Sequence, residues 1–186
     1  ALVMIVHRHG QHTFSFILPD DVFVKETFRQ TSNGQISAKG LRPLDYAYER
    51  SQNSDKNIRA QFNWDTKTAT FQFDGKTETK PLPPMLQDRL SLFYQFKYWP
   101  KNKSSLRIPM SNGKGISDYV IVRGPEETLN VPAGEFRAIR YTRERTQDDD
   151  GVSVWMTDKY PAPVKIVIDG RKGERTEQVL VRVTQD

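Results

Sequence analysis

Alternation of apolar and polar residues is the dominant pattern along this chain. In IRAQFNWD, from Ile58 to Asp65, every second residue is apolar, and in TATFQFDG, from Thr68 to Gly75, Phe71 and Phe73 fall on one face. A period of two residues is typical of half-buried β-strands, because successive side chains point to opposite faces. The two runs are separated only by Asp65-Thr66-Lys67, which predicts a hairpin with both aromatic faces on the same core.

The second half of the chain repeats this alternation, with turn residues such as Asn112-Gly113, Gly124-Pro125 and Asp169-Gly170 between the runs. The expected strands are Ser105–Ser111, Ile116–Arg123, Glu126–Val131, Glu135–Arg145, Val152–Thr157, Val164–Asp169 and Glu177–Val183. Runs this close in sequence predict a fold that is mainly all-β. Its sheet should be a curved antiparallel meander with a half-barrel or barrel-like form.

One segment departs from the alternation and predicts a helix. From Pro81 to Pro100 the apolar residues recur close to helical spacing, and Pro83-Pro84 suits a first turn. We expect one short helix over about 84–97, packed on the sheet between two strand sets, and a single domain over 1–186. Because the chain starts inside the apolar run ALVMIV without an initiator Met, we also expect that a first strand and a secretion signal precede it.

Composition narrows the function classes. The chain has no cysteine, which excludes disulfides, thiolate metal sites and a cysteine nucleophile. It has no apolar run near the roughly 20 residues that span a bilayer, and neither a G-x-S-x-G nor a phosphate-cradling loop motif. No catalytic constellation is visible, so we expect neither an enzyme nor a cofactor.

All three histidines lie in the stretch VHRHGQHTF: His7, His9 and His12. On a strand, His7 and His9 would project from one face and could share a zinc ion, which gives a metal-dependent hydrolase as an alternative function. However, Gly10-Gln11 lies between two apolar runs, where a hairpin must reverse, and no acidic residue stands nearby to orient a histidine. We therefore predict a turn here and no metal site. The run Asp148–Asp150 before Gly151 is likewise interpreted as a hairpin reversal rather than a calcium loop.

A basic run, FRAIRYTRER, suggests a further alternative. It combines Tyr141 with four arginines: Arg137, Arg140, Arg143 and Arg145. Basic strands with interleaved aromatic residues can bind nucleic acid or another polyanion. The net charge of the chain is only +5, from 28 basic and 23 acidic residues. An exposed strand face explains the run more simply, so nucleic acid is not an expected partner.

Several short motifs occur in a fixed order along the chain. They are Ser32/Gly34, Gly40-Leu41-Arg42-Pro43, Phe62-Asn63-Trp64-Asp65, Gln87-Asp88-Arg89-Leu90-Ser91, Pro132–Phe136, Trp155 and Pro163-Val164-Lys165. Together, from about Ser32 to Lys165, they resemble the exported bacterial family known as domain of unknown function 3108. The resemblance implies a β-rich fold and a location in the Gram-negative periplasm or envelope. It implies no catalytic residues.

The aromatic residues give the functional hypothesis. Those expected on the concave face of the sheet or on the helix beside it are Phe62, Trp64, Phe71, Phe73, Phe93 and Tyr94. Such a surface either closes as core or leaves a slot for an apolar molecule. We predict a non-enzymatic envelope domain that binds a lipid-like or other apolar ligand, or a protein partner, on its curved sheet.

Overall fold

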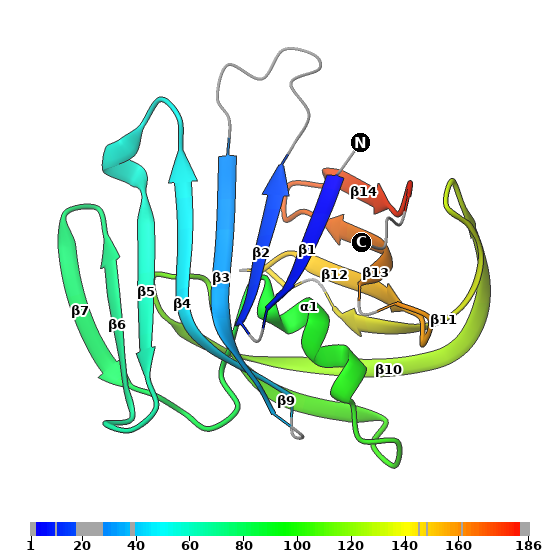
Figure 1. Ribbon diagram of the computed structural model, residues 1–186, viewed down its shortest axis with the longest axis horizontal. Coiled ribbons are helices and arrows are strands. Elements are labelled where there is room, and N and C mark those ends of the chain that lie inside the picture. Colours follow the sequence, from blue (N-terminus) through cyan, green and yellow to red (C-terminus); the bar gives the residue numbers. More distant parts are fainter. Residues whose placement is uncertain are drawn as a thin grey trace. The chain divides into compact units, whose positions relative to one another are not determined.

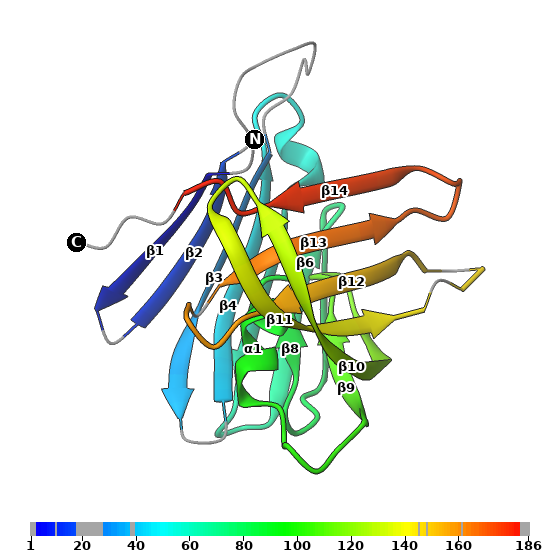
Figure 2. The same cartoon turned by 90° about the vertical axis from the view of Figure 1, so that its right-hand side faces the viewer.

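The computed structural model describes residues 3–9, 11–17, 28–37, 40–144, 146–147, 149–160 and 162–182. Within them the chain forms two compact units. The first comprises Val3–Gln95 and Ile108–Asp118, and the second comprises Phe96–Arg107 and the residues from Tyr119 onward. Strands make up most of both units (Figures 1 and 2). The expected mainly all-β class is therefore confirmed, while the expectation of a single domain stays a prediction.

The first unit contains a sheet in which each strand pairs with the next one along the chain. Its seven strands are β1 (Val3–His9), β2 (Gln11–Ile17), β3 (Phe28–Ser37), β4 (Gly40–Arg50), β5 (Ile58–Asn63), β6 (Thr68–Phe73) and β7 (Lys76–Pro81). All of these pairs are antiparallel. The predicted meander is thus confirmed for this sheet, and Figure 1 shows it in colours from blue to green. A 3₁₀ turn, η1 (Ser54–Lys56), connects β4 to β5.

The alternation in β5 and β6 separates core from solvent as predicted. Ala60 and Phe62 are buried while their neighbours in β5 are exposed or half-buried. In the register of the hairpin, Ala60 lies opposite Phe71, and Phe62 lies opposite Ala69. Cross-strand partners share a face, so these four side chains form one patch of the core.

A bulge bends the β3–β4 hairpin at Gly34. The register shifts between Asn33 and Gly34, where two strands approach closely. A Cβ atom on Gly34 would lie 2.4 Å from the carbonyl oxygen of Arg42 and 2.8 Å from the Cα atom of Pro43. Both contacts are with backbone atoms, which cannot move aside as a flexible side chain can. The bulge therefore requires glycine, because any side chain would force the strands apart.

We expect Gly34→Ala to lower the free energy of unfolding by about 2 kcal/mol, the usual cost of forcing a methyl group into a filled space. Urea denaturation monitored by tryptophan fluorescence measures it. The matched control is Gly115→Ala, whose Cβ would meet only the Nζ atom of Lys80, at 3.7 Å. Equal effects of the two substitutions would contradict the close approach at the bulge.

The helix is shorter than the predicted 84–97. The α-helix α1 covers Ser91–Gln95, and a 3₁₀ turn, η2 (Phe96–Tyr98), follows it. The preceding residues are not helical because Met85 has a φ angle of +61° and Gln87–Asp88 form the short strand β8. β8 pairs in parallel with β9 (Ser105–Ser111), and α1 lies against β4 and β8.

The second unit contains a second antiparallel meander. It consists of β10 (Ile116–Val131), which belongs to this unit from Tyr119 on, β11 (Gly134–Arg143), β12 (Gly151–Met156), β13 (Pro163–Asp169) and β14 (Arg175–Val179). The predicted break at Gly124-Pro125 is wrong. β10 continues through it with a bulge between Arg123 and Glu126, which accommodates a proline that has no N–H to donate. The predicted last strand, Glu177–Val183, is also shifted, since β14 starts at Arg175 and ends at Val179.

The tip of the β10–β11 hairpin is bonded to the residue after β14. The N–H of Ala133 donates to the carbonyl oxygen of Leu180, at 3.1 Å, and the N–H of Leu180 donates to Val164, at 2.9 Å. A hydrophobic cluster lies beside these bonds: Phe136, Ala138, Trp155, Val164 and Val167. A second group of rings in this unit packs around Tyr141, which is stacked on Phe96 with ring centroids 4.8 Å apart.

Candidate functional site

Three of the six aromatic residues predicted to bind a ligand are buried in the first unit. Phe71 is 0% exposed, Phe62 2% and Tyr94 4%. The Phe62 and Phe71 rings meet edge to face, with centroids 6.5 Å apart. The structure thus brings the β5 and β6 rings together on one face as predicted, and here they are part of the core.

The other three predicted residues, Trp64, Phe73 and Phe93, are half-buried. Two of these rings lie under cations. The guanidinium carbon of Arg42 is 5.0 Å from the Trp64 ring, and the Nζ atom of Lys114 is 5.3 Å from the Phe73 ring. The indole N–H of Trp64 also donates to the carbonyl oxygen of Pro43, at 2.7 Å. The Gly-Leu-x-Pro and Phe-x-Trp-Asp motifs are therefore in direct contact.

A buried carboxylate connects two further motifs. Asp88 is 0% exposed, and its Oδ2 atom accepts a hydrogen bond of 2.6 Å from the hydroxyl of Ser32. Its Oδ1 atom accepts from the backbone N–H groups of Leu90 and Ser91, both at 2.8 Å. In return, the Ser91 hydroxyl accepts from the N–H of Asp88. Asp88 and Ser91 thus form a reciprocal cap that begins α1 and is anchored on β3.

Two glutamines hold the start of β4 to the same segment. The Oε1 atom of Gln95 accepts from the N–H of Leu41 at 2.7 Å, and the Nε2 atom of Gln87 donates to the carbonyl oxygen of Leu41 at 3.0 Å. Gly40 has a φ angle of +116°, and a Cβ atom there would lie 2.3 Å from Oε1 of Gln95. The Gly40-Leu41 motif and the Gln87-Asp88 motif are therefore two halves of one buried polar junction.

The electrostatics of this junction follow from burial. Desolvation raises the pKa of Asp88, and the hydrogen bonds from Ser32, Ser91 and Leu90 oppose that shift without cancelling it. Burial also raises the pKa of Tyr46 and that of Tyr94 far above the ordinary range. Because the Asp88 carboxyl is enclosed and already bonded within the core, it is in no position to meet a substrate.

The histidine stretch forms a hairpin. β1 and β2 pair up to His9 opposite Gln11, which confirms the predicted reversal at this point. The side chains of His7, His9 and His12 lie outside the described part of the structure. Among the described residues, no group of three or more His, Cys, Asp or Glu side chains could hold a metal ion. No described helix is long and apolar enough to span a membrane.

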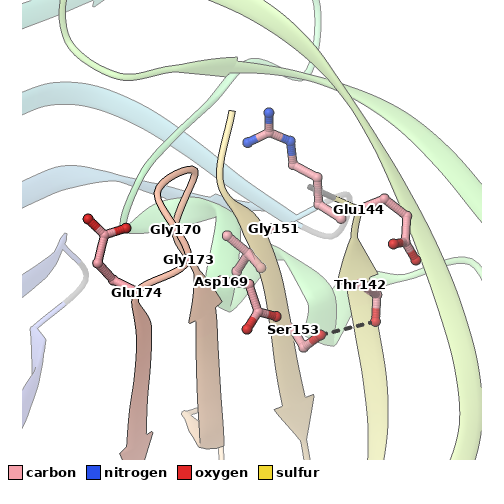
Figure 3. A pocket seen from close by; sticks show the side chains of 10 residues that line it. Thr142, Glu144, Gly151, Ser153, Asp169, Gly170, Gly173 and Glu174 are labelled. Atoms are coloured by element: carbon pink, nitrogen blue, oxygen red, sulfur yellow. Dashed lines mark hydrogen bonds between the residues drawn. The ribbon is translucent and has the colours of Figure 1, made fainter. Parts of the chain in front are cut away.

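A cleft in the second unit was not predicted. It has a volume of about 350 Å³ and lies where β11 ends, β12 begins and the β13–β14 turn closes (Figure 3). Its walls are formed by Thr142, Arg143, Glu144, Gly151, Val152, Ser153, Asp169, Gly170, Gly173 and Glu174. On one wall the hydroxyls of Thr142 and Ser153 are hydrogen-bonded across β11 and β12, at 3.4 Å.

The charges around the cleft are partly compensated. Arg143 is 8% exposed, with its guanidinium 3.4 Å from the centroid of the Tyr119 ring and paired with Asp149. Asp169 is paired with Arg175. Within the described residues no ion pair compensates Glu144 or Glu174, although Glu174 accepts a bond from the backbone of Lys172. The residues that line the cleft thus carry three carboxylates against one guanidinium, while Arg171 and Lys172 lie beside it in the β13–β14 turn.

The sequence contained a signal for this cleft. Asp150-Gly151 and Asp169-Gly170 are both predicted turns; the first precedes the run Val152–Thr157, and the second follows the neighbouring antiparallel run Val164–Asp169. Such turns fall at the same edge of a sheet, which is where the cleft lies. The same reasoning missed the junction, whose signal was Asp88-x-x-Ser91, a pattern typical of a helix cap.

Comparison with known proteins gives a family but no activity. A family model described as "Protein of unknown function (DUF3108)" matches residues 17–177. No curated protein matches the chain. One solved structure, titled as a beta-barrel-like protein of domain of unknown function DUF1849 from Brucella abortus, is similar at 11% identity with a TM-score of 0.46. The match covers 97% of this chain and 82% of that one.

Proposed function

We propose a binding role without catalysis for this chain, which belongs to the DUF3108 family of proteins of unknown function. The ligand we propose is a small, hydroxylated molecule that carries a positive charge, and the site is the cleft between β11, β12 and the β13–β14 turn. The observation that carries the proposal is the cleft itself. Its volume, about 350 Å³, falls in the range of small-molecule sites, roughly 300–1,000 Å³.

The lining of the cleft supports this ligand class. The hydroxyls of Thr142 and Ser153 can each donate and accept, which suits a hydroxylated molecule. Three glycines line the cleft without a side chain to fill it: Gly151, Gly170 and Gly173. Glu144 and Glu174 supply negative charge for an ammonium group. The described carboxylates are not grouped to hold a metal ion, which favours an organic cation that spans the cleft.

A role without catalysis is supported by what the motif residues do. Ser32, Asp88 and Ser91 bond to one another or to the backbone of the junction. Gln87, Gln95 and Trp64 bond to the backbone of β4. These bonds position β3, β4 and α1.

Two earlier expectations stay proposals. An apolar ligand beside Phe62, Phe71 and Tyr94 requires these buried rings to open, so the cleft is the better-supported site. A periplasmic location depends on the family resemblance alone, and cell fractionation of the natural protein tests it.

Titration of the isotope-labelled protein with glucosamine tests the cleft, with N-acetylglucosamine as the neutral control. We expect glucosamine to shift the amide resonances of Gly151, Gly170 and Gly173. Glu174→Gln should weaken this binding about tenfold, since it removes a charge-assisted hydrogen bond. Glu49→Gln, in the first unit, should leave the affinity unchanged. Equal binding of both sugars, or shifts confined to other residues, would exclude the proposed ligand class.

A further inference from the structure

Four lysines of the first unit lie near β6 and the turn that follows it, against Phe71, Phe73 or Asp74. They are Lys56 in η1, Lys76 and Lys80 in β7, and Lys114 in the turn between β9 and β10. We propose that this lysine cluster docks the protein on a surface of anionic lipid headgroups. The inference concerns the first unit and is independent of the cleft.

The register of β6 and β7 places two of these lysines on the aromatic face. Phe73 lies opposite Lys76, and Phe71 lies opposite Glu78. Cross-strand partners share a face, so Lys76 and Lys80 project from the same side of the sheet as the two rings. The Nζ atom of Lys80 is 5.9 Å from the centroid of the Phe71 ring.

The other two lysines come from elements far away in the sequence. The Nζ atom of Lys114 is 5.3 Å from the Phe73 ring and 2.8 Å from Oδ2 of Asp74. The hydrogen bond from Lys114 lowers the pKa of Asp74, and the charges of Lys114, Lys76 and Lys56 lower it further. The turn that carries Lys114 also lies against Ile58, two residues from Lys56, since a Cβ atom on Gly113 would lie 2.6 Å from the Ile58 side chain.

The cluster has a positive surplus. Its four lysines face two carboxylates, Asp74, bonded to Lys114, and Glu78, 3.2 Å from Lys80, so four positive charges less two leave a net charge of +2. Lys56 and Lys76 are exposed. Protection of an edge strand from aggregation accounts for lysines on β7. It does not account for Lys56 and Lys114, which η1 and the β9–β10 turn bring to the same place.

The chemistry of the cluster fits a lipid surface. All four cations are lysines, which act as point charges, whereas arginine forks recognise single phosphate groups bidentately. Clustered lysines are attracted to the diffuse negative potential of anionic lipids. The basic run of β11 is less available, because Arg143 is buried and Arg137 is paired with Glu126.

Co-sedimentation with phosphatidylcholine vesicles, with and without phosphatidylglycerol, tests the proposal. We expect binding only when phosphatidylglycerol is present, and weaker binding as salt rises. Lys56→Gln with Lys76→Gln should reduce the partition coefficient about 30-fold, because each lysine near an anionic surface contributes about fivefold. Lys101→Gln with Lys103→Gln, which removes two exposed lysines of the second unit, is the matched control.

Three outcomes would overturn the docking proposal. The first is binding to phosphatidylcholine alone, and the second is an equal loss in the control pair. The third is an absence of binding to vesicles that contain phosphatidylglycerol; duplex DNA binding that the Lys56/Lys76 pair abolishes would then assign the cluster to nucleic acid. Glu174→Gln should bind vesicles like the natural sequence, so failure of the cleft and failure of the lysine cluster are distinguishable.

Discussion

Asp88→Ala is expected to lower the free energy of unfolding by about 2–4 kcal/mol. The substitution removes a helix cap, which costs about 1 kcal/mol. It also leaves the Ser32 hydroxyl and the N–H groups of Leu90 and Ser91 without their acceptor in the core, at about 1–3 kcal/mol. Urea denaturation measures the loss, and a change below about 1 kcal/mol would mean that water or neighbouring groups replace the carboxylate.

Asp88→Asn is the matched variant, and it tests the protonation state of the carboxyl. An asparagine can still accept from Leu90 and Ser91 and can donate to the Ser32 hydroxyl, so we expect a loss of less than about 1 kcal/mol. The pKa of Asp88 is raised in the folded protein. The folded state therefore binds the proton more tightly than the unfolded state does.

The sign of the pH dependence follows from this shift. The stabilisation by Asp88 is fully present below the ordinary pKa of an aspartate, about 3.9, and is lost as the pH rises through the raised folded pKa. The stability of the natural protein relative to Asp88→Asn should thus fall with rising pH over that window, by at most about 1.4 kcal/mol per pH unit. If the stability of the natural protein relative to Asp88→Asn rose with pH instead, the carboxylate would be ionised in the core.

Phe71→Ala is expected to lower the free energy of unfolding by about 3–5 kcal/mol, the range for removing a large ring from a filled core. The side chain is 0% exposed and meets Phe62 edge to face. Urea denaturation measures this loss, and the m-value should stay unchanged. An effect below about 1.5 kcal/mol would mean that the space around the ring is loosely filled, as a slot for an apolar ligand requires.

Phe73→Ala is the control for this substitution. Phe73 lies two residues further along β6 on the same face, but it is half-buried with Lys114 above it. Less area is returned to water on its removal, so the expected loss is about 1–2 kcal/mol. Equal losses at the two positions would contradict the division of this face into a closed core at Phe71 and a charged margin at Phe73.

The predicted bounds of the helix, about 84–97, are wrong. Apolar spacing from Met85 to Tyr94 fits a helix, yet α1 begins only at Ser91. Residues 87 and 88 extend instead because they pair with Met110 and Ser111 on β9. Pairing with a strand more than twenty positions away overrides a local periodicity, and nothing in the local sequence reveals that partner. The strand break predicted at Gly124-Pro125 is wrong for the same reason, since β10 continues through this pair as a bulge.

The patterns of the chain predicted the mainly β class, the β5–β6 hairpin, most strands after residue 104 and most of the turns, because a period of two residues and the turn chemistry of glycine, proline and aspartate act over a few neighbours. What the motifs and charges do depends instead on contacts between distant segments. Ser32 meets Asp88, Gln95 meets Leu41 and Lys114 meets Asp74 across 56, 54 and 40 positions. Such contacts depend on which strands pair and in which register. For that reason the sequence held only local turn and cap signals of the cleft and the junction, and the partners within the junction and the lysine cluster came from the folded chain.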